Sequence, residues 1–149
     1  MSEAIAYQVM PANWHDLNGL RQIEKACFPQ DAWPLWDLIA VLTLPGVARF
    51  KAMAGEVMAG FVAGDIRRPE QVGWITTLGV LPVYQRRGIA KALLITCETE
   101  MDQPTVKLSV RRSNQPAISL YLKEGYKQTG VWPHYYPGGE DALILEKQR

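Results

Sequence analysis

The sequence predicts one α/β domain with a mixed, largely antiparallel sheet flanked by helices. The chain has 149 residues, 48% hydrophobic and 21% charged, which is typical of one globular domain. Runs with the two-residue alternation of strands are interspersed with runs that have the 3.6-residue period of helices. Short connections with glycine or proline join successive β-rich runs, as in antiparallel neighbours. We therefore expect a single domain over residues 1–149.

The first half of the chain is expected to form a strand, two helices and a hairpin. Asn13 can cap a helix whose apolar face includes Ile23 and Glu24. Pro45-Gly46 ends the second helix, because proline lacks an N–H group and glycine favours turns. Gly55 lies between two β-rich runs. The expected bounds are 4–10 for the strand, Asn13 to about residue 28 and 35–44 for the helices, and 47–53 and 57–65 for the hairpin strands.

The second half is expected to alternate strands and helices. Strict alternation along residues 72–81 predicts one face with Trp74, Thr76, Leu78 and Val80, and another with Ile75, Thr77 and Gly79. The helix from Gly88 to residue 101 is apolar around most of its circumference, which predicts deep burial. The remaining expected elements are a strand over 106–110, a helix capped by Ser113 or Asn114 and ended by Gly125, and strands over 126–132 and 142–146.

Composition excludes several classes of function. The formal net charge is +1, which gives no large positive field for nucleic acid or an anionic membrane. No window has the length of a membrane span, and the N-terminus lacks a signal pattern, so we expect a cytoplasmic protein. Cys27 and Cys97 fall far apart in different elements, which favours reduced thiols. With only two histidines besides, no metal site is expected.

The turn that joins an apolar strand to the long helix carries the most informative pattern. It contains Arg86, Arg87 and Gly88. At a helix N-terminus, free N–H groups and the positive end of the helix dipole face one point, and guanidinium groups add charge. Glycine lets the backbone approach an anion closely. The pattern predicts a pyrophosphate cradle; an ordinary turn with solvated arginines is the alternative.

Three motifs together resemble the GNAT superfamily of acyl-CoA-dependent N-acyltransferases. Residues 85–90 read Gln-Arg-Arg-Gly-Ile-Ala, similar to the family's Gln/Arg-x-x-Gly-x-Gly/Ala turn. Residues 114–121 read Asn-Gln-Pro-Ala-Ile-Ser-Leu-Tyr, similar to its Asn-x-x-Ala-x-x-Leu-Tyr helix. Residues 135–137 and 140–145 resemble the tail of RimI-like enzymes, which acetylate protein N-termini. The resemblance spans the whole chain.

The resemblance implies acetyl-CoA as co-substrate, with its pantetheine arm in a gap between the fourth and fifth strands. Asn114 can both cap its helix and touch the cofactor. Gly79 either permits a bulge that aims the Leu78 N–H group or is a weak point in the strand. The implied cofactor-binding residues are Leu78, Gly79, Val80, Gln85, Arg86, Arg87, Gly88, Ile89, Ala90, Lys91, Asn114 and Tyr121.

The same resemblance implies catalytic roles. Leu78 offers its N–H group to the developing oxyanion, and Tyr121 is the general acid for the departing thiolate; alone, a helix tyrosine is usually core packing. Ser109 stands where RimI-like enzymes have glutamate, and a hydroxyl cannot take a proton from an ammonium group. Trp74 replaces a tyrosine of related enzymes, and indole only donates. The candidates for holding a water that relays the proton are Ser109, His134, Tyr135 and Glu140.

The acceptor side is implied by two loops, residues 27–33 and 134–137, which resemble those flanking the peptide in N-terminal acetyltransferases. The implied substrate-binding residues are Phe28, Trp33, Trp74, Tyr135 and Tyr136, although Phe28 can instead close the core. The leading expectation is an acetyl-CoA-dependent N-acetyltransferase for a protein or peptide N-terminus, as a monomer or homodimer. Alternatives are acetylation of a polyamine, amino acid or aminoglycoside, and a non-catalytic acyl-CoA-binding module.

Overall fold

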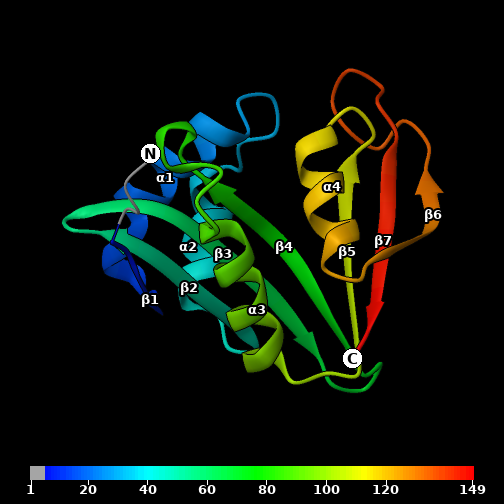
Figure 1. The fold of residues 1–149 in the computed structure, drawn as a ribbon, viewed down its shortest axis with the longest axis horizontal. Coiled ribbons are helices and arrows are strands. Elements are labelled where there is room, and N and C mark those ends of the chain that lie inside the picture. The colour runs from blue at the N-terminus through cyan, green and yellow to red at the C-terminus, as the bar shows by residue number, and fades with distance from the viewer. Residues whose placement is uncertain (1–5) are drawn as a thin grey trace.

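The computed structural model describes residues 6–149, in which helices cover both faces of a seven-stranded sheet (Figure 1). Its strands are β1 (Gln8–Pro11), β2 (Val47–Ala54), β3 (Val57–Arg67), β4 (Val72–Val80), β5 (Thr105–Arg111), β6 (Lys127–Trp132) and β7 (Ala142–Gln148). Its α-helices are α1 (Leu17–Cys27), α2 (Leu35–Thr43), α3 (Ile89–Met101) and α4 (Gln115–Lys123). The predicted α/β class is confirmed.

The sheet is antiparallel except at its centre. The strand order is β1-β2-β3-β4-β5-β7-β6, and β4 and β5 form its parallel pair. Residues Val72–Ile75 of β4 pair with residues Thr105–Leu108 of β5. Beyond these pairs they diverge, so that the sheet opens like a V away from the C-terminus (Figure 1). The splay implied by the sequence resemblance is confirmed.

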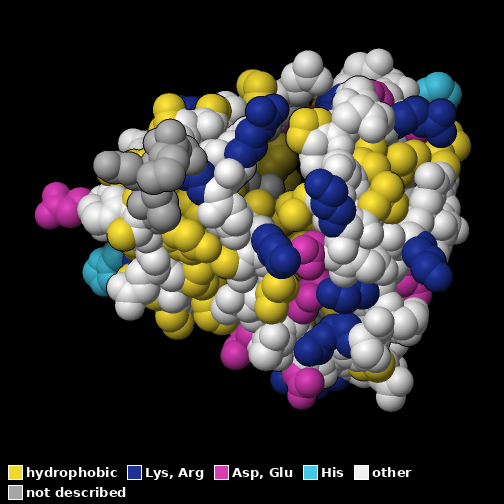
Figure 2. Space-filling view, viewed as in Figure 1, with side chains coloured by type: hydrophobic (Ala, Val, Ile, Leu, Met, Phe, Trp, Pro, Cys, Tyr) yellow, Lys and Arg dark blue, Asp and Glu magenta, His cyan; other side chains and the backbone are white. Residues whose placement is uncertain are grey.

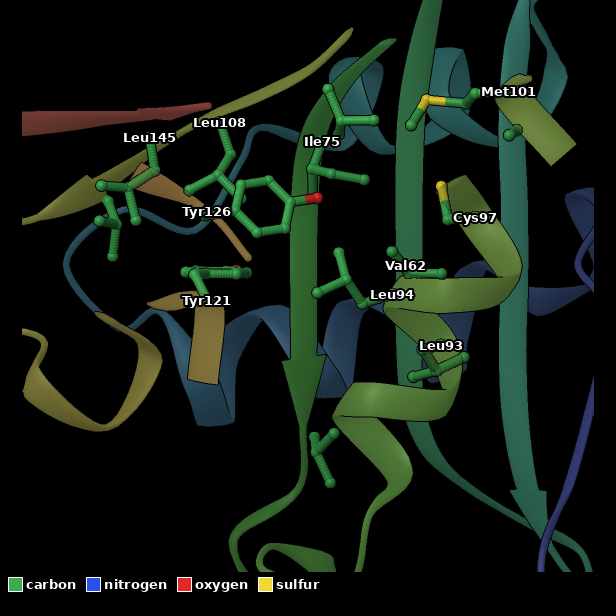
Figure 3. Packing of buried hydrophobic residues seen from close by; sticks show 14 of the residues in the cluster. Val62, Ile75, Leu93, Leu94, Cys97, Met101, Leu108, Tyr121, Tyr126 and Leu145 are labelled. Atoms are coloured by element: carbon green, nitrogen blue, oxygen red, sulfur yellow. The ribbon is translucent and has the colours of Figure 1, made fainter. Parts of the chain in front are cut away.

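Two apolar cores lie on opposite faces of the sheet. The larger core packs α3 and α4 against the sheet and includes Leu93, Leu94 and Tyr121 (Figure 3). The smaller core lies under α1 and α2 and includes Leu20 and Phe61. Each fully buried side chain of this size contributes about 1.5–3 kcal/mol.

A β-bulge at Thr76 changes which residues face each core. Ile75 and Thr77 pair with adjacent residues of β3, so Thr76 is an extra residue. Before the bulge, Ile75 packs in the α3 core, and after it Val80 does so. Thr77 instead bonds to α1. The predicted strict alternation is therefore wrong, because an inserted residue reverses the side-chain alternation beyond it.

The element bounds differ from the prediction by a few residues. Residues 4–5 of the predicted first strand lie outside the described residues, and β1 begins at Gln8. Asn13 caps a 3₁₀ turn, Trp14–Asp16, rather than α1 itself. A second 3₁₀ turn, Pro82–Tyr84, follows β4, and β7 extends two residues farther than expected, because it pairs with β5 as far as Gln148.

Candidate functional site

A cavity of about 610 Å³ opens where β4 and β5 diverge. Figure 2 shows a hollow on the α3–α4 face, with Lys and Arg side chains beside it. We call the cavity the splay cavity. Its lining comes from β4, β5, α4 and both loops predicted to flank the acceptor, and includes Phe28, Trp33, Leu78, Ser109, Asn114, Tyr121, Tyr135 and Tyr136. The fold thus brings these predicted residues together.

The Leu78 N–H group is directed toward the splay. Leu81 N donates to Ala59 O at 2.8 Å, so the backbone polar groups of Leu81 face β3. Gly79 lies two residues before Leu81 and therefore faces β3 as well. Because alternate residues of an antiparallel strand face the same neighbour, Leu78 and Val80 face the other side, toward β5. Consistently, the Val80 carbonyl accepts from Gln85 Nε2 at 2.9 Å. The geometry fits the predicted oxyanion donor.

Gly79 has a different role from the one expected. The bulge is at Thr76, three residues earlier, so Gly79 does not form it. A Cβ on Gly79 would lie 3.0 Å from Ile23 Cγ2 and 3.2 Å from Cys27 Sγ. Glycine is therefore present because α1 packs closely on β4 at this point.

The Tyr121 side chain is buried with its ring edge-on to Tyr126 (Figure 3), at a centroid distance of 5.6 Å. Burial raises the pKa of Tyr121 well above its ordinary value, and Tyr136 adds to the shift. The phenol therefore stays protonated at neutral pH and can donate. Tyr121 packs in the core and also lines the splay cavity, and its role as general acid stays a prediction.

The acceptor side of the splay cavity is aromatic and polar. Tyr136 Oη donates to Ser109 Oγ at 3.2 Å. Tyr135 packs edge-on against Tyr136. Phe28 lines the cavity, so it does not merely close the core, and Trp33 lines the cavity and also packs on the smaller core.

Trp74 does not line the splay cavity, contrary to expectation. Its ring lies 5.9 Å from that of Trp132, and the Arg67 guanidinium lies over it. Trp74 precedes the bulge and pairs with Lys107, where β4 and β5 have not yet separated. That position explains why Trp74 lies outside the splay cavity.

Two of the suggested water-holding residues serve the loop structure instead. His134 is exposed, and its Nδ1 lies 3.0 Å from Gly139 O. Glu140 bonds to Ser113 and to Arg111. The hydrogen bonds from Ser113 and then Arg111 hold the pKa of Glu140 below its ordinary value, which makes it a poor proton acceptor.

The predicted cradle lies at the N-terminus of α3. Gly88 has a φ of +82°, and no atom lies within 4 Å of where its Cβ would be. Ala92 N donates to Gly88 O in the first helical hydrogen bond, so the preceding N–H groups of the helix point outward. No side chain caps this end of the helix within residues 6–149. Arg86 and Arg87 are exposed beside it. These features fit an anion that replaces the missing cap.

Asn114 caps its helix as expected, and its contact with the cofactor stays a prediction. Its Oδ1 accepts from Ala117 N at 3.3 Å, which caps α4, and the residue also lines the splay cavity. Lys91 is exposed and forms an ion pair with Glu124 at 3.5 Å.

Residues 17–126 match the family model described as the Acetyltransferase (GNAT) family. The chain belongs to this family. It is 31% identical to an N-alpha-acetyltransferase of Sulfurisphaera tokodaii, over 93% of this chain and 91% of that protein. It is 30% identical to the N-terminal acetyltransferase A complex catalytic subunit NAA10 of Arabidopsis thaliana, over 89% of this chain and 72% of that protein.

The crystal structure of the ribosomal-protein-S18-alanine N-acetyltransferase from Escherichia coli superposes with a TM-score of 0.86 at 26% identity, covering 96% of this chain and 94% of that one. The chain is thus an acetyl-CoA-dependent N-acetyltransferase. In its described part, no helix has the length and apolarity to cross a membrane, and no three His, Cys, Asp or Glu side chains gather as metal ligands.

Glu24 lies at the site of this acetyltransferase, although it was not among the residues predicted from the sequence. This residue is buried and lines the splay cavity beside Thr77. The sequence did contain an indication, because Glu24 lies on the apolar face of α1, where a charged side chain is rare unless it has a structural or functional role.

A second missed feature is a clamp between the two acceptor loops. Arg111 at the end of β5 binds Asp31 with two hydrogen bonds of 2.7 Å. Its third nitrogen donates to Glu140 Oε1 at 2.9 Å, and Nη2 also reaches the carbonyl of Pro137. The guanidinium lies over the Tyr136 ring, 4.8 Å from its centroid. Arg111 therefore fixes both walls of the acceptor side.

Replacing Arg111 by methionine is expected to lower the Tm by about 2–4 °C at pH 7 and to raise KM for the acceptor. Because the pKa of Glu140 is lowered in the fold, its contribution is present above pH 4.5 and is lost as the pH falls further. The Tm difference should therefore shrink below about pH 4. Thermal unfolding by circular dichroism measures it. Arg112→Met is the control, since Arg112 is exposed and its single ion pair, with Asp141, is long at 3.6 Å. A loss of Tm in Arg112→Met equal to that in Arg111→Met would contradict the clamp.

Proposed function

We propose that this enzyme acetylates the α-amine of a protein or peptide N-terminus in the cytoplasm. The observation that carries the proposal is the splay cavity, which joins the buried Tyr121 to an acceptor mouth walled by Phe28, Tyr135 and Tyr136. An aromatic mouth suits a peptide backbone with a small first side chain. The relatives named N-alpha-acetyltransferase and S18-alanine N-acetyltransferase support the same acceptor.

The residues at the N-terminus of α3 are proposed to hold the pyrophosphate of acetyl-CoA. Support comes from the outward N–H groups that follow Gly88 and from the exposed guanidinium groups of Arg86 and Arg87. Leu78 and Val80 would pair with the pantetheine arm, because their polar backbone groups face the splay. The hydrogen bond from Gln85 Nε2 to the Val80 carbonyl connects the turn to the end of β4 and so would hold the pyrophosphate site in place relative to that strand.

Bound acetyl-CoA supplies an activated acetyl thioester, and the protein provides polar groups around it. The Leu78 N–H group is placed to stabilise negative charge on a carbonyl oxygen in the splay. The Tyr121 hydroxyl, which like any phenol is protonated at neutral pH, donates a proton to a leaving thiolate. Tyr136 and Ser109 orient the acceptor through their hydrogen-bonded hydroxyl groups.

The enzyme is expected to prefer an α-amine over a lysine side chain by roughly 200-fold. At pH 7.5, an amine with a pKa of about 8 has roughly 200 times the neutral fraction of one at 10.4. Release of CoA should be followed with peptides that have a free N-terminus and an internal lysine, and mass spectrometry should locate the acetyl group. A peptide with a blocked N-terminus is the control. Comparable labelling of its lysine would refute the assignment, and binding of acetyl-CoA without turnover on any amine would indicate a binding module.

A further inference from the structure

A buried carboxylate lies on the acceptor side of the splay cavity. Glu24 on α1 is 2% exposed and lines the cavity. Its Oε1 accepts a hydrogen bond of 2.9 Å from Thr77 Oγ1. Thr77 follows the bulge and directly precedes Leu78. The bulge therefore places this carboxylate beside the proposed oxyanion donor.

Glu24 differs from the other acidic groups near the cavity because it has no cationic partner. Asp31 and Glu140 both bind Arg111. Within residues 6–149 no Lys, Arg or His forms a salt bridge with Glu24. A carboxylate without a fixed counter-charge, in a cavity that admits an amine, can accept a proton or bind an ammonium group.

We infer that Glu24 is the general base of the reaction, and the inference rests on the proposed function. Its carboxylate takes one proton from the ammonium group of the acceptor, directly or through one water, and releases it to solvent at the cavity mouth. The neutral nitrogen then forms the C–N bond as the C–S bond breaks. The second proton lost by nitrogen passes to the Tyr121 oxygen, directly or through water, and replaces the proton that Tyr121 gives to the thiolate. Thr77 is a positioning residue that holds the carboxylate.

The surroundings of Glu24 suit this role. Burial raises its pKa, and hydrogen bonds from Thr77 and the Trp33 backbone offset part of the shift. The other titratable groups that line the cavity are Asp31, Arg111, Tyr121, Tyr135 and Tyr136, and Cys27 on α1 interacts electrostatically with Glu24. Burial raises the pKa of the Cys27 thiol to about 11 and also raises those of Tyr121 and Tyr136, so these three groups are neutral at pH 7.

Glu24→Gln is expected to lower kcat about 100-fold, because general base catalysis contributes about this much or more. Glutamine keeps the size of the side chain and can still accept from Thr77, so the affinity for acetyl-CoA, measured by calorimetry, should not change. In the native enzyme, kcat should rise with pH as Glu24 loses its proton, and the variant should lack this rise. Glu56→Gln, an exposed change in the β2–β3 turn, is the matched control.

A second readout does not depend on turnover. In the native enzyme without ligands, the ¹³C carboxyl resonance of Glu24, assigned by its absence from Glu24→Gln, should titrate above the ordinary 4.5. A peptide with an aminooxyacetyl N-terminus, which is neutral without a base, should restore much of the variant's rate. An active native enzyme with a Glu24→Gln kcat within threefold, or a titration at or below 4.5, overturns the inference alone. A native enzyme inactive on every N-terminal peptide overturns the proposed acceptor and the inference together.

Discussion

Replacing Tyr121 by phenylalanine is expected to lower kcat by about 100-fold to 10,000-fold while leaving the affinity for acetyl-CoA nearly unchanged. The ring remains in the larger core against Tyr126, so packing is kept. Only the hydroxyl is lost. That hydroxyl is protonated at neutral pH, as phenols with the ordinary pKa of about 10 are, so it can protonate a leaving thiolate. The side chain is buried, where water has less access.

The matched control is Tyr126→Phe, which removes a buried hydroxyl from the ring beside Tyr121. Tyr126 Oη donates to Glu98 Oε2 at 2.5 Å and does not line the splay cavity. This control should lower the Tm with little change in kcat. Steady-state kinetics, calorimetry with acetyl-CoA and thermal unfolding on both variants separate the two roles. Equal losses of kcat in the two variants, or a parallel loss of cofactor affinity in Tyr121→Phe, would show that Tyr121 only packs.

The larger features of the fold could be predicted because they depend on local sequence. The circumferential apolar pattern of α3 predicted its burial, and Gly88 marked the start of that helix. The order of elements and three motifs implied the splayed sheet. The same motifs placed Leu78, Ser109 and Tyr121 near one another, and the splay cavity confirms that proximity.

The bulge at Thr76 could not be predicted because it arises from pairing between strands. Ile75 and Thr77 are assigned to one predicted face by alternation, yet β3 leaves no partner for Thr76 between them. Nothing in residues 72–80 marks the extra residue. Its consequence is that Thr77 turns toward α1 and meets Glu24. Trp74 was expected in the acceptor site from the resemblance, but it lies before the bulge, with its ring 5.9 Å from that of Trp132.

Placing glutamate at Gly88 is expected to weaken acetyl-CoA binding by at least about 100-fold. The backbone there has a φ of +82°, and the space beside it is open. A carboxylate in that space would lie beside the proposed pyrophosphate site and repel it. Two like charges about 4 Å apart near a protein surface repel by about 4 kcal/mol, and a 100-fold loss needs only about 2.8 kcal/mol. Calorimetric titration with acetyl-CoA measures the loss.

The chain offers a close control in Gly55→Glu. Gly55 also has a positive φ, +63°, and open space beside it, but it lies in the β2–β3 turn. Both variants place the same side chain in a left-handed backbone conformation, so both should lose stability to a similar degree. Only Gly88→Glu should lose acetyl-CoA affinity, because only Gly88 precedes the outward N–H groups of α3. Equal affinity in the two variants would place the coenzyme's diphosphate elsewhere and remove the basis for a thioester delivered to Tyr121.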